Sequence, residues 1–323
     1  PSRCARTQPW ATCGTGLNPA VTLHEEANRV SEETLDMLVT LVGEQPMANL
    51  LPIRYLRPRR ALLLFSEKTQ PISDKLKQVL CRWRTSSDEP QVEVLEQEVQ
   101  PYDIAPARQA IREELESCGW DPSKTIFNLT GGTKPMMIAA YDIARSRRAR
   151  AVYLHSEDSR SLLYYYSFND GGEGIAPDCT VEIPGVITLR DYLDVHLGVN
   201  GYAHGQSANG PGGPIEQAVF TAIRNAVDEA DVAIKIGSAV DIDLAVRCGN
   251  QVGIAEIKTG RDANRKRAID QLNTAAHPAF LGRYTARFLI IDRHHTDRNV
   301  SELAKQRGIT VIELPSYSAD GTI

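Results

Sequence analysis

Short apolar runs alternate with stretches of helical spacing along the first part of this chain. The run at 61–65 is apolar throughout, a pattern typical of a strand buried on both faces of a parallel sheet. Further strands are predicted at 37–42, 91–99, 125–129, 151–155, 162–166 and 179–183. Helices are predicted at 49–55, 73–83, 104–118, 134–146 and 189–197. Strands that alternate with helices at this spacing indicate βαβ units and a Rossmann-like, mostly parallel sheet.

A glycine-rich stretch at 201–213 divides the chain. It has five glycines in thirteen residues and no apolar periodicity, so we interpret it as a linker between domains at 37–200 and 214–323. The second domain is also α/β, with elements predicted in the following order: a helix at 215–227, a strand at 232–236, a hairpin at 238–260, a helix through 271–272, a strand at 287–292, a helix and a strand at 309–314. Residues 1–36 show little periodicity, and we expect either an accessory extension or the product of an upstream start assignment.

The hairpin has a turn signal that sets its register. The Gly249–Asn250 pair tolerates the positive φ that a tight turn requires. With these two residues as the loop, Val246 faces Gly253 and Asp243 faces Glu256. One face of the hairpin is then expected to be packed, and we assign to it Ile242, Leu244, Ile254 and Ile257.

The same register gathers charged residues on the other face. Asp243, Glu256 and Lys258 share this face, with Asp241 opposite Lys258. Carboxylates this close repel one another unless a positive group lies between them, and a divalent metal ion would be such a group. A solvated strand face with an ordinary Asp–Lys pair is the alternative interpretation.

Three polar loops follow strands of the first sheet, at 43–49, 66–70 and 130–134. In such sheets ligands bind at the carboxyl ends of the strands. The loop at 130–134 has two glycines for close backbone approach, a helix N-terminus behind it and the charge of Lys134, which together suit a phosphate. A plain strand-to-helix turn is the alternative. The loop is neither a dinucleotide fingerprint nor a Walker A loop, which argues against a dehydrogenase or an NTPase.

Composition further narrows the classes of protein to which the chain can belong. The 323 residues suit two domains, and a hydrophobic fraction of 42% is enough for two cores. The formal net charge is −5, so contact with nucleic acid would depend on a local basic patch such as Arg261, Arg265, Lys266 and Arg267; a solvated helix face is the alternative. No apolar run could span a bilayer, and six scattered cysteines indicate neither a zinc site nor a disulfide framework. We expect a cytoplasmic protein.

Two groups of residues carry a resemblance to known families. Residues 41–46 with Asn49, and the loop at 130–134, resemble a CARF domain, the cyclic-oligoadenylate sensor of type III CRISPR systems. Glu216, Asp243 and the Glu256–Ile257–Lys258 triplet resemble a PD-(D/E)xK restriction-type nuclease. Together, over 37–314, they resemble the CARF nuclease effectors of these systems. Asp241 stands where the family would have Glu, and the Pro of the motif is absent.

The resemblance implies a Rossmann-like CARF sensor domain followed by a restriction-endonuclease-like nuclease domain. It implies a homodimer that binds cyclic tetra-adenylate across two sensor domains and then changes the access of its nuclease domains to DNA or RNA. The residues that the resemblance assigns to the ligand are Gly43, Glu44, Gln45, Asn49, Ser66, Thr69, Thr130, Gly131, Gly132, Thr133 and Lys134.

For the nuclease, the resemblance implies that Asp243, Glu256 and the Ile257 carbonyl bind Mn²⁺ or Mg²⁺. Glu216 would reach the metal directly or through water, although by itself a carboxylate in the first turn of a helix is explained by the helix dipole. Lys258 would orient the water or stabilise charge on the phosphate, and Gln271 is a weaker candidate for positioning the nucleophile.

Two rival functions stay open. One is a metal-independent ribonuclease that would use Arg287 and His294, which flank an apolar strand where such a site needs a helix. The other is a ligand-gated regulator with a degenerate nuclease fold. Whether the sensor also cleaves its own ligand does not follow from any residue.

Overall fold

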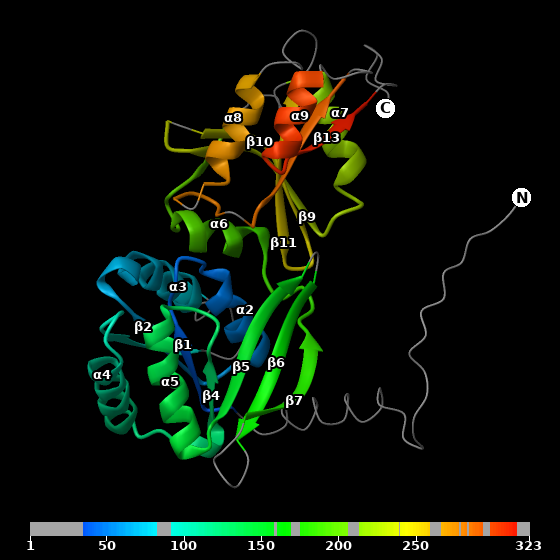
Figure 1. Cartoon of the computed structure of the whole chain (residues 1–323). Helices are drawn as coiled ribbons and strands as arrows, with labels where there is room; N and C mark the ends of the chain where they lie inside the picture. Colours follow the sequence, from blue (N-terminus) through cyan, green and yellow to red (C-terminus); the bar gives the residue numbers. More distant parts are fainter. Residues whose placement is uncertain are drawn as a thin grey trace, which may run out of the picture. The chain divides into compact units, whose positions relative to one another are not determined.

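A computed structural model describes residues 35–82, 92–157, 160–168, 175–205, 213–238, 240–258, 266–277, 279–282, 284–292 and 298–314 (Figure 1). The predicted extension up to residue 34, together with Arg261, Arg265 and His294, lies outside these residues.

The first sheet has seven strands in the order β3-β2-β1-β4-β5-β6-β7 (Figure 1). Their bounds are β1 (Met37–Leu41), β2 (Arg60–Phe65), β3 (Glu93–Glu98), β4 (Thr125–Asn128), β5 (Arg150–Glu157), β6 (Arg160–Phe168) and β7 (Ile175–Glu182). The first five strands in chain order pair in parallel, and β6 and β7 extend the sheet as antiparallel strands. The predicted Rossmann-like, mostly parallel sheet is confirmed.

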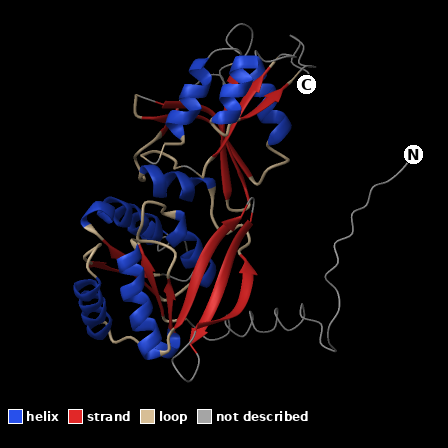
Figure 2. Ribbon diagram, viewed as in Figure 1, coloured by secondary structure: helices blue, strands red, loops and turns tan. Residues whose placement is uncertain are grey.

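Helices cover this sheet because its central strands are apolar on both faces. The helices are α2 (Met47–Leu56), α3 (Gln70–Arg82), α4 (Ile104–Ser117) and α5 (Lys134–Arg147), with short 3₁₀ turns η1 (Glu67–Thr69) and η3 (Pro122–Lys124). Helix α6 (Leu189–Leu197) follows β7 and packs on α3. Every residue of β1 is buried, and α4 and α5 pack together on β1 and β2 through residues such as Ile111 and Ile143. Figure 2 shows helices alongside both sheets of the chain.

The second sheet has six strands in the order β13-β12-β11-β10-β9-β8. The strands are β8 (Ala203–His204), β9 (Glu229–Ile236), β10 (Val240–Cys248), β11 (Gln251–Lys258), β12 (Ala286–Ile291) and β13 (Thr310–Glu313), and the helices are α7 (Pro214–Ile223), α8 (Lys266–Ala275) and α9 (Arg298–Gln306). Strands β8 to β11 pair antiparallel, whereas β11, β12 and β13 pair in parallel. Ile215 and Val219 of α7 pack on Leu244, Ala255 and Ile257 of the sheet.

Two elements of this domain differ from the sequence prediction. Helix α7 ends at Ile223, four residues before the predicted end, because the chain turns there and brings Asp228 to Arg247, 3.1 Å away. Part of the predicted linker is strand β8, in which Ala203 pairs with Lys235 of β9. Among the described helices, none combines the length and the apolar character needed to cross a membrane.

Candidate functional site

A pocket of about 580 Å³ lies where β1, β2 and β3 end and α5 begins. It is lined by Val42, Gly43, Glu44, Ser66, Glu67, Lys68, Thr69, Glu98, Gln100, Pro101, Tyr102, Gly132, Thr133 and Met136. Six of the predicted ligand residues are among them: Gly43, Glu44, Ser66, Thr69, Gly132 and Thr133. The sensor loops predicted from the sequence therefore meet at a single pocket.

Thr133 shapes the pocket at the start of α5. It is the N-cap, and its Oγ1 accepts a hydrogen bond of 3.4 Å from the Met136 amide and donates one to the Pro101 carbonyl, which joins two of the pocket loops. Gly132 before it has a φ of +66°, a conformation that favours glycine. Because Pro135 has no N–H and the Met136 amide is used by the cap, the helix offers fewer free donors to a phosphate than the sequence suggests.

Five predicted ligand residues do not line this pocket: Gln45, Asn49, Thr130, Gly131 and Lys134. Asn49 is fully buried below it, and its amide donates hydrogen bonds of 2.7 Å to Thr40 Oγ1 and to the Leu41 carbonyl. This arrangement holds the end of β1 against α2, so the structure gives Asn49 a structural place in the core.

Thr130 and Gly131 hold the loop between β4 and α5 in place through contacts with neighbouring strands. The Thr130 hydroxyl donates to Asn128 Oδ1 at 2.6 Å and accepts from the Leu154 amide at 2.7 Å. A Cβ at Gly131 would lie 1.8 Å from the Leu41 carbonyl oxygen, so only glycine fits there. Both residues support the pocket without lining it. Lys134, the first residue of α5, is exposed.

The segment from Glu98 to Tyr102 was missed by the sequence analysis. It follows the carboxyl end of β3, so the rule that selected the other three loops applies to it as well. Tyr102 is 80% exposed at the pocket, although large aromatic side chains are usually buried. Lys68 and Glu44 form an ion pair of 2.6 Å between two pocket loops, and this hydrogen bond raises the pKa of Lys68.

The register of the β10–β11 hairpin agrees with the turn at Gly249–Asn250. The paired residues run from Cys248 opposite Gln251 to Leu244 opposite Ala255. One prediction about its faces is wrong: Ile254 pairs with Ala245 and so alternates onto the face of Glu256, away from Leu244.

The ladder between β10 and β11 ends at Leu244 and Ala255, so it does not include the predicted pair of Asp241 and Lys258. On its other side β10 pairs with β9, where Asp241 lies opposite Lys235 with their side-chain charges 3.7 Å apart. On its other side β11 pairs with β12, where Lys258 lies opposite Ile291. The Asp241 side chain is 63% exposed, which separates it from the other carboxylates.

Asp243 lies where β10 and β11 separate. Its Oδ2 accepts a hydrogen bond of 2.7 Å from the Ile257 amide, so a side chain takes the place of the missing backbone partner. The same oxygen lies 3.4 Å from Lys258 Nζ, and Lys258 Nζ lies 2.5 Å from Glu256 Oε1. The structure thus brings together Asp243, Glu256 and Lys258, as the register predicts.

Glu256 has the most perturbed carboxylate of this group. It is 2% exposed, and burial first, then the charge of Asp243, raise its pKa to about 7 in spite of the contact with Lys258. Glu216 of α7 adds to this rise through its own charge. For Lys258, pairing with the two carboxylates outweighs burial and raises the pKa of the ammonium.

The remaining predicted residues lie on β11, α8 and β12. Ile257 pairs with Ile290 in the parallel ladder. On α8, Gln271 is half-buried, and Lys266 and Arg267 are exposed in the first turn. Arg287 donates a hydrogen bond of 3.3 Å to Asn273 of α8.

The donor chemistry of Asp243 and Glu256 fits a hard divalent cation. Two carboxylates converge, one of them buried and held in an environment that opposes its negative charge. In the structure the ammonium of Lys258 compensates the negative charge of these two carboxylates. Across the described ranges, no group of three or more His, Cys, Asp or Glu side chains is arranged to hold a metal. A metal would therefore be held by two carboxylates, with backbone oxygen or water completing the shell.

Comparison with known families gives one match, in the first part of the chain. Residues 37–192 match the family model described as the Card1 CARF domain. No curated protein matches the chain.

Three solved structures resemble the chain over most of its length. Can2 from Sulfobacillus thermosulfidooxidans, in complex with cyclic tetra-adenylate, is 17% identical with a TM-score of 0.67 and covers 89% of this chain and 97% of its own. VC1899 from Vibrio cholerae is 13% identical with a TM-score of 0.64, at 87% and 94% coverage. A type III CRISPR defence DNA nuclease activated by cyclic oligoadenylate is 15% identical with a TM-score of 0.58, and covers 95% of this chain and 54% of its own. The chain therefore combines a Rossmann-like domain that matches the CARF family model with a second α/β domain, in a fold that it shares with these proteins.

Proposed function

We propose that this chain is a cyclic-oligoadenylate-activated, metal-dependent nuclease of type III CRISPR defence. A CARF-type domain supports the sensing half of the proposal, and Can2, a protein of the same fold, is bound to cyclic tetra-adenylate. We propose cyclic tetra-adenylate as the activator, a homodimer as the active assembly and DNA as the principal substrate, with single-stranded RNA as a second substrate.

The surroundings of one residue support the proposal that the chain is a nuclease. A buried glutamate, Glu256, lies beside Asp243 and Lys258 at the point where β10 and β11 separate. Placing a carboxylate there opposes its ionisation, because burial and a second negative charge both favour the neutral form. Such an arrangement costs stability, and perturbed groups of this kind are concentrated at functional sites.

In the proposed mechanism Asp243, Glu256 and the Ile257 carbonyl would hold a metal ion. When bound, Mg²⁺ or Mn²⁺ polarises the scissile phosphate and lowers the pKa of a water molecule. Lys258, now shared between the two carboxylates, stabilises negative charge as it develops on the phosphate. Glu216 adds negative charge near Glu256 and so favours cation binding. To Lys266 and Arg267, which are exposed at the start of α8, we assign contact with the phosphate backbone.

The test is cleavage of supercoiled plasmid with Mn²⁺, with and without cyclic tetra-adenylate. We expect cutting that depends on the ligand, and a loss of at least about a hundredfold in Glu256→Gln and Asp243→Asn, the scale seen when a group that stabilises transition-state charge is removed. Asp241→Asn is the matched control. It neutralises a carboxylate two residues from Asp243 that is exposed and paired with Lys235, and it should cut at the wild-type rate.

Undiminished cutting by Glu256→Gln, or wild-type cutting that ignores the ligand, would contradict the proposal. Cleavage of single-stranded RNA in EDTA that survives Lys258→Ala would instead favour a metal-independent ribonuclease. Ligand binding without cleavage of any nucleic acid would favour a ligand-gated regulator.

A further inference from the structure

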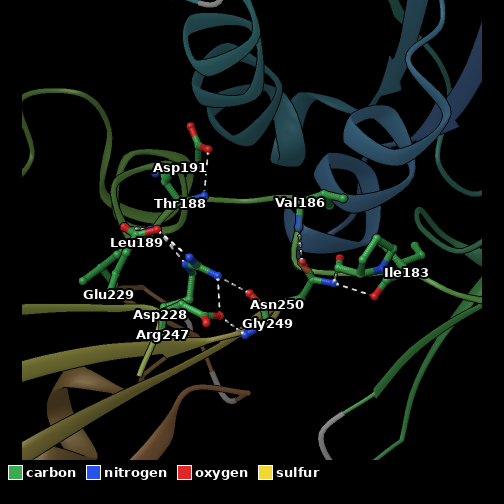
Figure 3. A network of polar contacts seen from close by, with 11 residues as sticks. Ile183, Val186, Thr188, Leu189, Asp191, Asp228, Glu229, Arg247, Gly249 and Asn250 are labelled. Atoms are coloured by element: carbon green, nitrogen blue, oxygen red, sulfur yellow. Dashed lines mark hydrogen bonds and ion pairs between the residues drawn. The ribbon is translucent and has the colours of Figure 1, made fainter. Parts of the chain in front are cut away.

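The turn of the β10–β11 hairpin is bound to the segment that connects β7 with α6. The side chain of Asn250 donates hydrogen bonds from Nδ2 to the carbonyls of Ile183, at 3.1 Å, and Pro184, at 2.7 Å (Figure 3). Its Oδ1 accepts one of 3.0 Å from the Val186 amide. One side chain therefore uses both its donor and its acceptor on the backbone of a segment more than sixty residues away.

Glycines allow this contact to be close. A Cβ at Gly185 would lie 3.2 Å from the Cα of Gly249, so the two backbones almost touch. Gly249 itself has a φ of +60°, which the turn requires. The approach fixes the position of the hairpin turn against the connecting segment.

Arg247 makes the turn rigid. It is 11% exposed, and its guanidinium contacts Glu229 at 2.8 Å, Asp228 at 3.1 Å and the Gly249 carbonyl at 2.6 Å (Figure 3). The Gly249 amide donates in turn to Asp228 at 2.7 Å. The second oxygen of Glu229 accepts from the amide of Leu189, the first residue of α6, at 2.8 Å. The turn is thus joined to the start of α6 by a second route.

Helix α6 is held to the sensor domain by buried charges. Asp191 Oδ1 lies 2.9 Å from Arg54 of α2 and 3.1 Å from Arg82 of α3, while its Oδ2 caps α6 through the Thr188 amide at 3.0 Å. Helices α2 and α3 each begin just after a loop that lines the sensor pocket. Asp191 therefore links α6 to two helices that each begin beside the pocket, and Glu229 links α6 to the hairpin.

The two strands that meet at this turn also carry Asp243 and Glu256. Between the turn and the two carboxylates lies an unbroken ladder of paired residues, from Cys248–Gln251 to Leu244–Ala255. This ladder connects the turn with the two carboxylates at the far end of the hairpin.

We propose that Asn250 is a positioning residue that transmits the state of the sensor pocket to the Asp243–Glu256 pair. The inference rests on the proposed function. Asn250 touches neither of the two carboxylates, and it acts by tying their hairpin to the segment at 183–186. Coupling between two sites requires a physical element that both sites bias, and this tether is that element.

The test compares wild type, Asn250→Ala, Asn250→Asp and Cys248→Ala in three measurements. These are the affinity for cyclic tetra-adenylate, the ratio of plasmid cleavage with and without this ligand, and amide hydrogen exchange along 183–189 and 244–256. Cys248→Ala is the control, because Cys248 is exposed in the same hairpin and should leave all three unchanged. Asn250→Asp keeps the acceptor for Val186 but presents a carboxylate to two carbonyls, so it should behave as Asn250→Ala does.

We expect the Asn250 variants to bind the ligand as wild type does, while the activation ratio falls about tenfold or more, within the usual range of coupling factors. The Val186 amide should exchange faster in Asn250→Ala, and ligand-dependent protection of 244–256 should disappear. The variants should remain folded, because Tyr192 of α6 still holds the Thr285 hydroxyl at 2.8 Å and the Leu281 carbonyl at 3.0 Å.

Equal activation ratios in Asn250→Ala and wild type would overturn the inference, and so would a loss of ligand binding confined to the Asn250 variants. Failure of the proposed function gives a different result. If wild type binds the ligand but cuts nothing, ligand-dependent protection of 244–256 in wild type and its loss in Asn250→Ala would still support the tether, and identical protection would overturn it. Absence of ligand binding by wild type overturns both.

Discussion

At the scale of single residues, Glu256 is the carboxylate under the greatest electrostatic constraint. Its neighbours Asp243 and Lys258 act in opposite directions, and burial adds to the effect of Asp243, so that its pKa rises to about 7. The native protein therefore keeps a proton on Glu256 up to about pH 7, whereas the unfolded chain releases it near the ordinary value of 4.5. Above pH 4.5, ionisation of Glu256 therefore costs the native state more free energy than it costs the unfolded state.

This imbalance predicts how stability depends on pH. In EDTA, wild type should lose stability relative to Glu256→Gln as the pH rises from 4.5 through 7, by about 3 kcal/mol in all. Glutamine cannot ionise, so the variant is free of this penalty. Urea unfolding at pH 4.5, 7 and 8 measures the difference. Asp241→Asn should follow the wild-type curve, and a gap between wild type and Glu256→Gln that stays constant with pH would contradict the assignment.

The position of Asp243 beside Glu256 could be predicted because a single turn dipeptide and the two-residue period of a strand determine it. The surroundings of Asp241 could not be predicted in this way, because its partner Lys235 lies on β9, on the other side of β10 from the hairpin partner β11. Asn49 was assigned to the ligand through the family resemblance, within the loop at 43–49. Helix α2 begins at Met47, earlier than the pattern suggests, and this places Asn49 in the core.

At the scale of elements, the loop between β4 and α5 is built on close backbone packing. Gly131 lies against the Leu41 carbonyl of the first strand, and Gly132 has a positive φ beside the pocket. The sequence analysis gave the two glycines to phosphate binding. The structure shows a steric reason for Gly131 that does not depend on a ligand.

Gly131→Ala tests that reason. The new Cβ would meet backbone, which cannot swing aside, so we expect the free energy of unfolding to fall by about 1–3 kcal/mol, as in overpacked sites. Thermal unfolding without ligand is the measurement. Gly213→Ala is the comparison, because no atom lies within 4 Å of its Cβ position, and its cost should stay below about 1 kcal/mol. Equal losses in the two variants would refute the steric explanation.

The elements themselves were largely predictable. Periodicity located the strands of the first sheet and the start of α6, because apolar runs and helical spacing are local properties. The end of α7 could not be predicted from local sequence. The apolar stripe continues past Ile223, but the chain leaves the helix there and Asp228 pairs with Arg247 of β10. The hydrogen bonds of Asn250 could not be predicted either, since its partners at 183–186 are remote in sequence.

At the scale of the whole described chain, two sheets are joined through α6. Asp191 is central to this junction: it is buried, it faces Arg54 and Arg82, and it closes the capping box of α6 with Thr188. Removing one partner of a buried ionic group leaves an uncompensated charge, which costs far more than the loss of an exposed pair.

Asp191→Asn should therefore lower the free energy of unfolding by about 3 kcal/mol, because the buried Arg54 loses the charge of Asp191, while Arg82 keeps its pair with Asp194 and the shape of the cap is kept. Asp142→Asn is the control. It breaks an exposed pair with Arg108, 3.5 Å long, and should cost at most about 1 kcal/mol. Denaturant unfolding of the two variants gives the comparison, and similar losses would show that the α6 junction is not a stabilising ionic cluster.

The charges around the sensor pocket have a consequence for selectivity inside a cell. The lining that the structure describes includes three glutamates, Glu44, Glu67 and Glu98, and one lysine, Lys68, which is already paired with Glu44. Such a lining is unfavourable for compact, highly charged anions such as nucleoside triphosphates, which are abundant competitors for any adenine-binding site. A cyclic oligonucleotide spreads its charge around a ring and offers many base and sugar groups for short-range contacts. Under the proposed function, these glutamates would weaken the binding of abundant nucleoside triphosphates to the pocket. The protein would then respond to a cyclic oligonucleotide present at a much lower concentration.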